Sequence, residues 1–162
     1  MEELYKQIKE AHEKRGFKKL FEFVLNASKK IKEKILKLWE RVVIEKRISW
    51  LNENLERLRT GNPIEDALNI FYKTYLGISP EKDGEILEKS ERKLVTRWWN
   101  KYPILENCEK FGLDTRETCK KVYEKPAQIF LSKINPNLKF RRHYELIRPH
   151  APFCEEIITY EE

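Results

Sequence analysis

The sequence predicts an α+β fold in which long N-terminal helices precede an antiparallel sheet of about four strands that is covered by helices. Apolar residues recur at helical spacing through residues 17–58. Short segments with β-forming residues follow in two pairs, and each pair is joined by a turn or a loop. The order helices, hairpin, helices, hairpin is typical of an α+β protein.

Residues 1–60 are expected to form a basic helical region. A first short helix is predicted at residues 4–14, and Gly16 separates it from the next segment. Residues 17–58 contain no proline, so they predict one long helix, or two helices with a break near residues 45–49. We expect one face of this helix to pack on the C-terminal domain and another to pack on a second chain in a homodimer.

Residues 61–162 are expected to form an α+β domain of the kind that binds a ligand. Asn62-Pro63 predicts a helix start, with Asn as the cap and Pro at the first helical position. Gly77 predicts the end of this helix. Residues 85–88 and 93–99 favour a hairpin of two strands.

The second half of this domain predicts two more helices and a final pair of strands. One helix runs from Pro103 to Lys110, and Asp114 caps the next. Pro126 lies inside the second helix and should kink it or start a new segment. The last two strands are predicted at residues 138–147 and 153–160.

The net charge of +6 belongs to the N-terminal region. Residues 1–50 hold 14 Lys or Arg against 8 Asp or Glu, whereas residues 51–162 hold 19 of each kind. Attraction to phosphate or to acidic surfaces would therefore start at the N-terminal helices. No helix-turn-helix spacing, zinc finger or aromatic RNA-binding motif accompanies these charges, so a solvated Lys/Glu surface is the simpler interpretation and nucleic acid is not the expected partner.

Composition places further bounds on the class of protein. No apolar run is long enough to span a membrane, and the charged N-terminus lacks the apolar stretch of a secretory signal, so we expect a cytoplasmic protein without a membrane partner. The three cysteines are an odd number and are expected to remain thiols. Charged residues make up 37% of the chain, mainly Lys and Glu, as in proteins from hot environments.

The cysteines are the first candidates for chemistry. Cys108, Cys119 and Cys154 are widely separated along the chain, unlike the closely spaced ligands of a structural zinc site. Three roles stay open: inert buried thiols, thiols that line a ligand pocket, or ligands of a metal ion or an iron–sulfur cluster. The sequence identifies no cofactor.

Arginine, tryptophan and histidine side chains of the predicted strands are candidates for ligand binding. Arg97 and Arg142 carry guanidinium groups that suit carboxylate ligands. Their alternative role is cross-strand pairing with glutamates, namely Glu145, Glu155 and Glu156. Trp98 and Trp99 point to opposite faces of a strand, so at least one should be buried. His143 is expected either to contact a ligand or to be a solvated or ion-paired side chain.

The usual nucleotide-binding and hydrolase motifs are absent: the chain has no G-x-G-x-x-G, P-loop, G-x-S-x-G or H-E-x-x-H. A longer pattern is present in the C-terminal third. A strand leads into a proline, and a helix, G-L-D, a cysteine-bearing helix, N-P-x-L-x-F and a final C-[DE] strand follow. In this chain the pattern reads Arg97 to Pro103, Phe111-Gly112-Leu113-Asp114, Cys119, Asn135-Pro136-Asn137-Leu138-Lys139-Phe140 and Phe153-Cys154-Glu155.

This pattern resembles the L-2-amino-thiazoline-4-carboxylate hydrolase-like family, and more distantly the small-molecule-binding domains related to 4-vinyl reductases. The resemblance covers the stretch from Arg97 to the end of the sequence well, residues 62–96 loosely and residues 1–60 not at all. It implies a cytoplasmic α+β ligand-binding domain and, for true members, hydrolytic opening of a thiazoline ring. The family has a cysteine before the proline, where this chain has Tyr102.

The resemblance implies a small-molecule pocket between the sheet and the helices of residues 103–134. Cys119 and Cys154 would line it, with Cys108 near by, and Arg97 or Arg142 would face an anionic ligand. In an enzyme, the acid–base or nucleophilic roles would fall to Cys119, Cys154 and Glu155, because hydrolysis needs a group that activates water or attacks carbon.

Two other functions stay open. The basic helices could drive dimerisation or dock on nucleic acid or on a protein partner. Alternatively, all three cysteines could serve a metal or iron–sulfur sensor.

Overall fold

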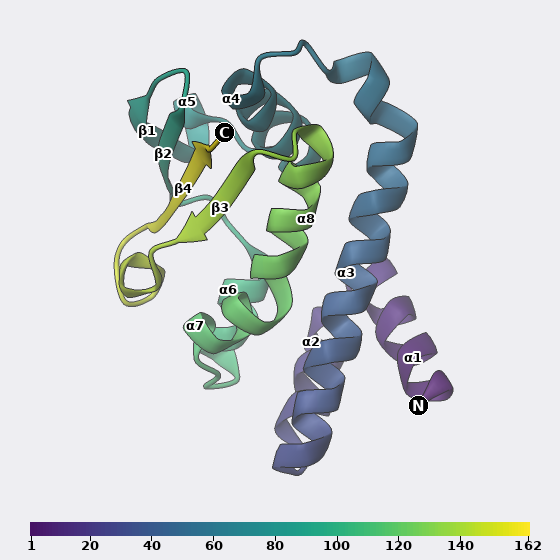
Figure 1. The fold of residues 1–162 in the computed structure, drawn as a ribbon. Helices are drawn as coiled ribbons and strands as arrows, with labels where there is room; N and C mark the ends of the chain where they lie inside the picture. The colour runs from purple at the N-terminus through teal and green to yellow at the C-terminus, as the bar shows by residue number, and fades with distance from the viewer. The chain divides into compact units, whose positions relative to one another are not determined.

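The computed structural model describes residues 1–162, and Figure 1 shows its helices and strands in chain order. The chain divides into two compact units. The first unit comprises Met1–Lys46 and Lys101–Pro126, and the second comprises Arg47–Asn100 and Ala127–Glu162. Each unit therefore combines two separate segments, whereas a single boundary near residue 60 was expected. None of the helices combines the length and the apolar character that crossing a membrane requires.

The first unit is helical. It contains α1 (Glu2–Glu13), α2 (Phe17–Leu25), the first part of α3 (Lys29–Leu58), α6 (Pro103–Lys110), α7 (Thr115–Thr118) and the π-helix η2 (Cys119–Glu124). Its core surrounds Trp39, whose ring makes edge contacts with Phe21 at 5.5 Å and with Tyr123 at 6.0 Å between centroids. The predicted helix at residues 4–14 and the separation at Gly16 are confirmed.

The N-terminal helical stretch is interrupted earlier than expected. The chain leaves the helix between α2 and α3, at residues 26–28, and α3 then continues without a break through residues 45–49. Asn26 and Ser28 explain the position, because their short polar side chains compete with helical backbone hydrogen bonds. The prediction of a break at residues 45–49 is wrong, since Val43, Arg47 and Leu51 are all buried along one face of an intact helix.

The second unit contains the sheet, and the predicted α+β class with about four antiparallel strands is confirmed. The strands are arranged in the order β1-β2-β4-β3 and every neighbouring pair is antiparallel. Their bounds are β1 (Gly84–Lys89), β2 (Lys93–Trp98), β3 (Leu138–Arg142) and β4 (Cys154–Tyr160).

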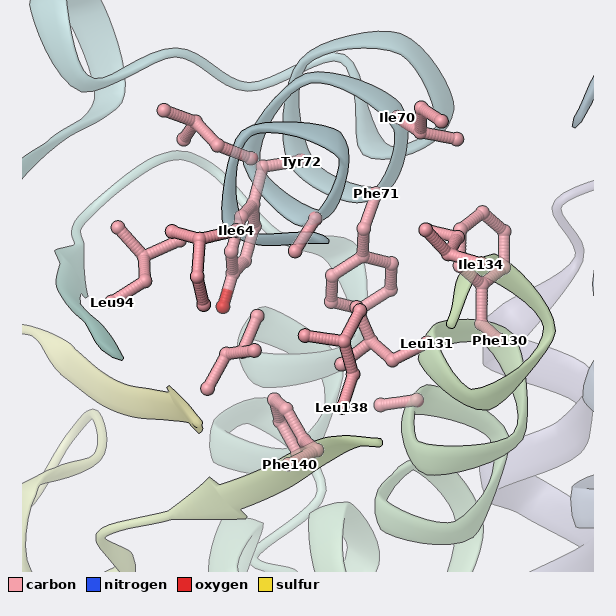
Figure 2. Close-up of a cluster of buried hydrophobic side chains, with 14 of the residues drawn as sticks. Ile64, Ile70, Phe71, Tyr72, Leu94, Phe130, Leu131, Ile134, Leu138 and Phe140 are labelled. Atoms are coloured by element: carbon pink, nitrogen blue, oxygen red, sulfur yellow. The ribbon is translucent and has the colours of Figure 1, made fainter. Parts of the chain in front are cut away.

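Helices cover one face of this sheet. They are α4 (Pro63–Asp66), the π-helix η1 (Ala67–Leu76) and α8 (Lys125–Ile134), while the short α5 (Pro80–Asp83) leads into β1. Phe71, Phe130 and Leu131 from the helices meet Leu138 and Phe140 of β3 in one hydrophobic cluster (Figure 2). This cluster is the core of the second unit.

The helix that begins after Asn62 has the predicted limits but an unexpected middle. Asn62 Oδ1 accepts a hydrogen bond from the Glu65 N–H at 3.2 Å, and Gly77 ends the helix in the left-handed region at φ 69°. Between them, ten residues form a π-helix. The second π-helix, η2, ends just before α8, in which Pro126 is the second residue, as expected for a proline that starts a new segment.

The third strand is shorter than predicted. β3 ends at Arg142, and the 3₁₀-helix η3 (Tyr144–Leu146) follows, closed by a hydrogen bond from the Leu146 N–H to the His143 carbonyl at 2.8 Å. The prediction of a strand over residues 138–147 is therefore wrong at its end. Pro149 and Pro152 lack the N–H groups that a longer ladder needs, so the connection to β4 is irregular.

Candidate functional site

The sheet of the second unit carries two clusters of polar side chains, one on each face. Glu155 and Glu156 are neighbours on β4, so they point to opposite faces. We call the group around Glu155 the outer cluster, which consists of Glu85, Arg97, His143 and Glu155. The group around Glu156 is the inner cluster, which consists of Tyr72, Thr96, Trp98, Arg142 and Glu156.

The outer cluster centres on the carboxylate of Glu155, a residue that is 8% exposed. Arg97 Nε donates to Glu155 Oε2 at 2.8 Å, and His143 Nδ1 lies 3.2 Å from Glu155 Oε1. Arg97 also approaches Glu85 at 3.8 Å and lies over the ring of Phe153 at 4.1 Å. Three predicted site residues are thus brought into contact: Arg97 on β2, Glu155 on β4 and His143 just beyond β3.

The charge of Glu155 is maintained by its two partners. Burial alone would raise the pKa of this carboxyl group, but the hydrogen bonds and charges of Arg97 and His143 outweigh burial and hold the pKa below its usual value. Glu155 is therefore ionised at neutral pH. A carboxylate that holds one nitrogen of an imidazole fixes the orientation of the ring.

The inner cluster is a closed network between the sheet and η1. Arg142 donates to Glu156 Oε1 from Nη2 at 3.0 Å and from Nε at 3.2 Å, and the Tyr72 hydroxyl donates to Glu156 Oε2 at 2.8 Å. Trp98 Nε1 donates to the Thr96 hydroxyl at 2.9 Å. Burial, together with the negative charge of Glu156, raises the pKa of Tyr72 well above its usual value, so the phenol remains a hydrogen-bond donor.

Both predicted anion-binding arginines have carboxylate partners on β4. Arg97 lies directly opposite Glu155 in the ladder, and Arg142 lies opposite Glu156. These are the cross-strand ion pairs that were the alternative role for the two arginines. Trp98, the predicted ligand-binding tryptophan, is buried against Tyr72 with ring centroids 4.8 Å apart, while Trp99 is exposed.

The cysteines occupy different surroundings. Cys108 and Cys119 are buried and belong to the first unit, whereas Cys154 is half-buried on β4 of the second unit. Burial raises the pKa of the Cys108 thiol to about 11, against a hydrogen bond with Thr118 that lowers it. The Cys154 sulfur accepts weak hydrogen bonds from the backbone N–H and from Nε of Arg148, each at 3.5 Å.

A metal site formed by the cysteines finds no support in the geometry. The structure contains no group of three or more His, Cys, Asp or Glu side chains that could hold a metal ion. Cys108, Cys119 and Cys154, the ligands of the metal or iron–sulfur alternative, therefore do not form such a group.

The space between the sheet and α8, where part of the ligand pocket was expected, is filled by side chains. Leu131 of α8 packs there with Leu138 and Phe140 of β3 (Figure 2), and the Gln128 side chain of α8 forms hydrogen bonds with the backbone of the same two β3 residues. An open hollow of about 530 Å³ lies instead at the end of the sheet that carries Tyr160. None of the predicted site residues lines it; its lining residues are Gly61, Asn62, Pro63, Glu91, Arg92, Asn135, Tyr160 and Glu162.

Exposed basic side chains follow one face of α3. Lys30, Lys34, Lys37 and Arg41 recur at intervals of three and four positions, and all four are exposed. We call this row the basic stripe. Arg41 pairs with Glu45 at 2.8 Å, whereas the three lysines form no ion pair within the chain. Positive charge is therefore available to a partner along the first turns of α3.

Comparison of the chain with protein-family models, with curated proteins and with solved structures finds no match. The fold and the clusters define an α+β protein with a four-stranded antiparallel sheet whose outer face carries a His–carboxylate–Arg group.

Proposed function

We propose that the chain is a small-molecule-binding protein of the hydrolase-like kind, related to the L-2-amino-thiazoline-4-carboxylate hydrolase-like family that its C-terminal third resembles. One observation carries this proposal: Arg97, His143 and Glu155, which come from three separate segments, meet around one buried carboxylate. An imidazole that is oriented by a carboxylate is a common means of moving a proton during hydrolysis.

In this proposal His143 is the proton acceptor and Glu155 is its positioning residue. Glu155 is ionised and holds Nδ1, so Nε2 is the nitrogen that faces other molecules when Nδ1 carries the proton. The His143 side chain is half exposed, which gives a ligand access to it. Arg97 is committed to Glu155 and Glu85, so its contribution is to keep Glu155 charged.

The cysteines contribute to the proposal unequally. A thiol with a pKa of about 11 is protonated at neutral pH, so Cys108 is a weak nucleophile. Cys119 and Cys154 remain the candidates for thiols that line a pocket or attack a ligand. Cys154 follows Phe153, whose ring contacts Arg97, and it precedes Glu155, so it is the cysteine nearest in sequence to the outer cluster.

The test uses L-2-amino-thiazoline-4-carboxylate as the probe, with binding followed by calorimetry and ring opening by thiol release. We expect His143→Gln to lower turnover strongly and Glu155→Gln to lower it less, because Glu155 only positions the imidazole. Cys119→Ser and Cys154→Ser measure the role of each thiol. His150→Gln, which changes an exposed histidine of the same loop, is the matched control.

Two results would contradict the proposal. In the first, the wild-type chain neither binds the probe nor opens its ring. In the second, His143→Gln and both cysteine variants behave as the wild type does. The first result removes the thiazoline substrate class, and the second removes the outer cluster and the cysteines as its site.

A second candidate function is supported by the basic stripe of α3. Three exposed lysines without acidic partners favour binding to an anionic surface, such as nucleic acid or an acidic protein. Lys34→Glu combined with Lys37→Glu should abolish a salt-dependent gel shift, while Lys73→Glu, an exposed lysine of the second unit, should leave the shift unchanged. Failure of the wild-type chain to bind at low salt would remove this candidate.

The proposed homodimer uses the same N-terminal helices. Leu25 and Ile31 are exposed on either side of the turn between α2 and α3, where apolar side chains could meet a second copy. Sedimentation of the wild-type chain and of a Leu25→Glu, Ile31→Glu variant measures this directly. A monomeric wild-type chain would contradict it.

A further inference from the structure

The most unusual buried group of the second unit is the guanidinium of Arg47 on α3. This residue is 6% exposed, and its Nε and Nη1 atoms are buried without any hydrogen-bond partner. Arg47 also forms no ion pair within the chain. A buried, unbalanced cation destabilises a fold by several kcal/mol, so proteins rarely retain one without a counter-ion.

The surroundings of Arg47 are aromatic. Its Cζ atom lies 5.6 Å from the ring centroids of both Phe71 and Tyr75, which are one turn apart on η1. Tyr75 in turn contacts the rings of Trp50 at 5.1 Å and Phe130 at 5.0 Å. We call the four rings of Trp50, Phe71, Tyr75 and Phe130 the aromatic wall. Trp50 and Tyr75 are only half-buried, so the aromatic wall reaches the surface of the protein.

Interactions within the chain compensate the charge only in part. Cation–π contacts with Phe71 and Tyr75 are each worth about 0.5–2 kcal/mol. Burial raises the pKa of Tyr75, while the charge of Arg47 and a hydrogen bond with it act in the opposite direction. Neither contact supplies a negative charge or an acceptor for Nε and Nη1.

We propose that Arg47 is the anchor of a second binding site, which takes the carboxylate of a small ligand with a flat apolar body. The ligand carboxylate accepts hydrogen bonds from the guanidinium and balances its charge, and its apolar part lies against the aromatic wall. One unbalanced guanidinium matches one negative charge, which favours a monocarboxylate over a phosphate dianion. The site shares no residue with the outer cluster and does not depend on its function.

The probe for this site is benzoate, a flat monocarboxylate, with benzamide as its neutral counterpart and inorganic phosphate as a second anion. Thermal unfolding and calorimetry of the full chain are measured with each compound. Benzoate should raise the Tm of the wild-type chain, and benzamide and phosphate should not. Arg47→Met should lose the benzoate shift and weaken the benzoate Kd by at least about tenfold, as expected for the loss of charge-assisted hydrogen bonds.

Three further variants make the outcome specific. Arg47→Lys keeps the charge without the planar fork and should retain a weakened response. Arg57→Met changes an exposed arginine on the same helix and should respond as the wild type does. Glu155→Gln should also respond normally, which separates this site from the outer cluster.

The ligand-free Tm distinguishes a ligand site from a structural one. Removal of an unbalanced buried charge should leave the Tm of Arg47→Met equal to or above that of the wild type. The proposal is overturned if benzoate fails to raise the wild-type Tm, if Arg47→Met keeps the full benzoate response, or if phosphate alone raises the Tm. A large fall in the ligand-free Tm of Arg47→Met would also overturn it, because the guanidinium would then be satisfied by packing and buried water.

Discussion

Two arginines of the second unit are almost equally buried, but only one of them has its positive charge balanced by an acidic side chain of the protein. Arg142, at the end of β3, has an 11% exposed side chain that pairs with Glu156, and Glu156 also accepts from Tyr72. Arg47, on α3, has two buried nitrogens without an acceptor. Both lie near η1, which places Tyr72 toward the sheet and Phe71 and Tyr75 near Arg47. The paired guanidinium of Arg142 therefore stabilises the fold, whereas the guanidinium of Arg47 is left without a counter-ion and is available to a ligand.

The largest expected effect on stability comes from removing the carboxylate that balances Arg142. Glu156→Ala removes the carboxylate that compensates Arg142 and that accepts from the Tyr72 hydroxyl. We expect the free energy of unfolding to fall by about 3 kcal/mol, as for other buried pairs that lose one partner. Urea denaturation measures the change, and Glu161→Ala, at an exposed position near the C-terminus, is the control. A loss no larger than that of the control would show that the pair contributes little.

A smaller effect tests the link between η1 and the sheet. Tyr72→Phe keeps the buried ring but removes the hydroxyl that donates to Glu156. A hydrogen bond to a charged acceptor is worth about 1.5–3 kcal/mol, so the stability should fall by about 2 kcal/mol. Tyr144→Phe provides a comparison at a less buried tyrosine. Equal stability of wild type and Tyr72→Phe would mean that Glu156 finds another donor.

The outer cluster should contribute less and should depend on pH. The pKa of Glu155 is lowered in the folded protein, so its contribution is present at pH values above the unfolded pKa and is lost as the pH falls through the folded value. Glu155→Gln should cost about 1 kcal/mol at neutral pH, and the difference from wild type should vanish in acid. Unfolding curves of both proteins across this acid range measure the difference in stability. A difference that stays constant with pH would contradict the lowered pKa of Glu155.

The smallest expected effect has the opposite sign. Arg47→Met loses two cation–π contacts and the hydrogen bond with Tyr75 but relieves the desolvation of an unbalanced cation. We expect the ligand-free chain to be unchanged or more stable by up to about 1 kcal/mol. Urea denaturation beside Arg142→Met, which should be destabilising because it leaves Glu156 without its guanidinium, makes the comparison direct. Destabilisation of both variants to the same extent would remove the distinction between the two arginines.

Local signals predicted much of the fold. Asn62 and Gly77 marked the ends of one helix because a cap and a left-handed residue act within a few positions. The alternation of side chains along a strand correctly predicted that at least one of Trp98 and Trp99 is buried. By contrast, η1 and the early end of β3 depend on packing and on the loop that follows, so no local pattern revealed them.

The site was predicted less completely than the fold. Arg97, His143 and Glu155 were named from their residue types, and the sheet brings them together. Arg47 was missed, although it shares a helix face with Val43 and Leu51, both buried. A basic residue in the middle of an apolar helical face was the signal that could have found it.

The sequence by itself determined the fold class, the positions of most helix and strand ends and the concentration of positive charge in the N-terminal helices, because these depend on neighbours in the chain. Only the tertiary structure decided which charged side chains are balanced. Glu156 on β4 lies opposite Arg142 on the neighbouring strand β3, whereas no acidic residue reaches Arg47. Pairing of buried charges depends on distances between segments that are far apart in the chain, and residue order alone does not encode those distances.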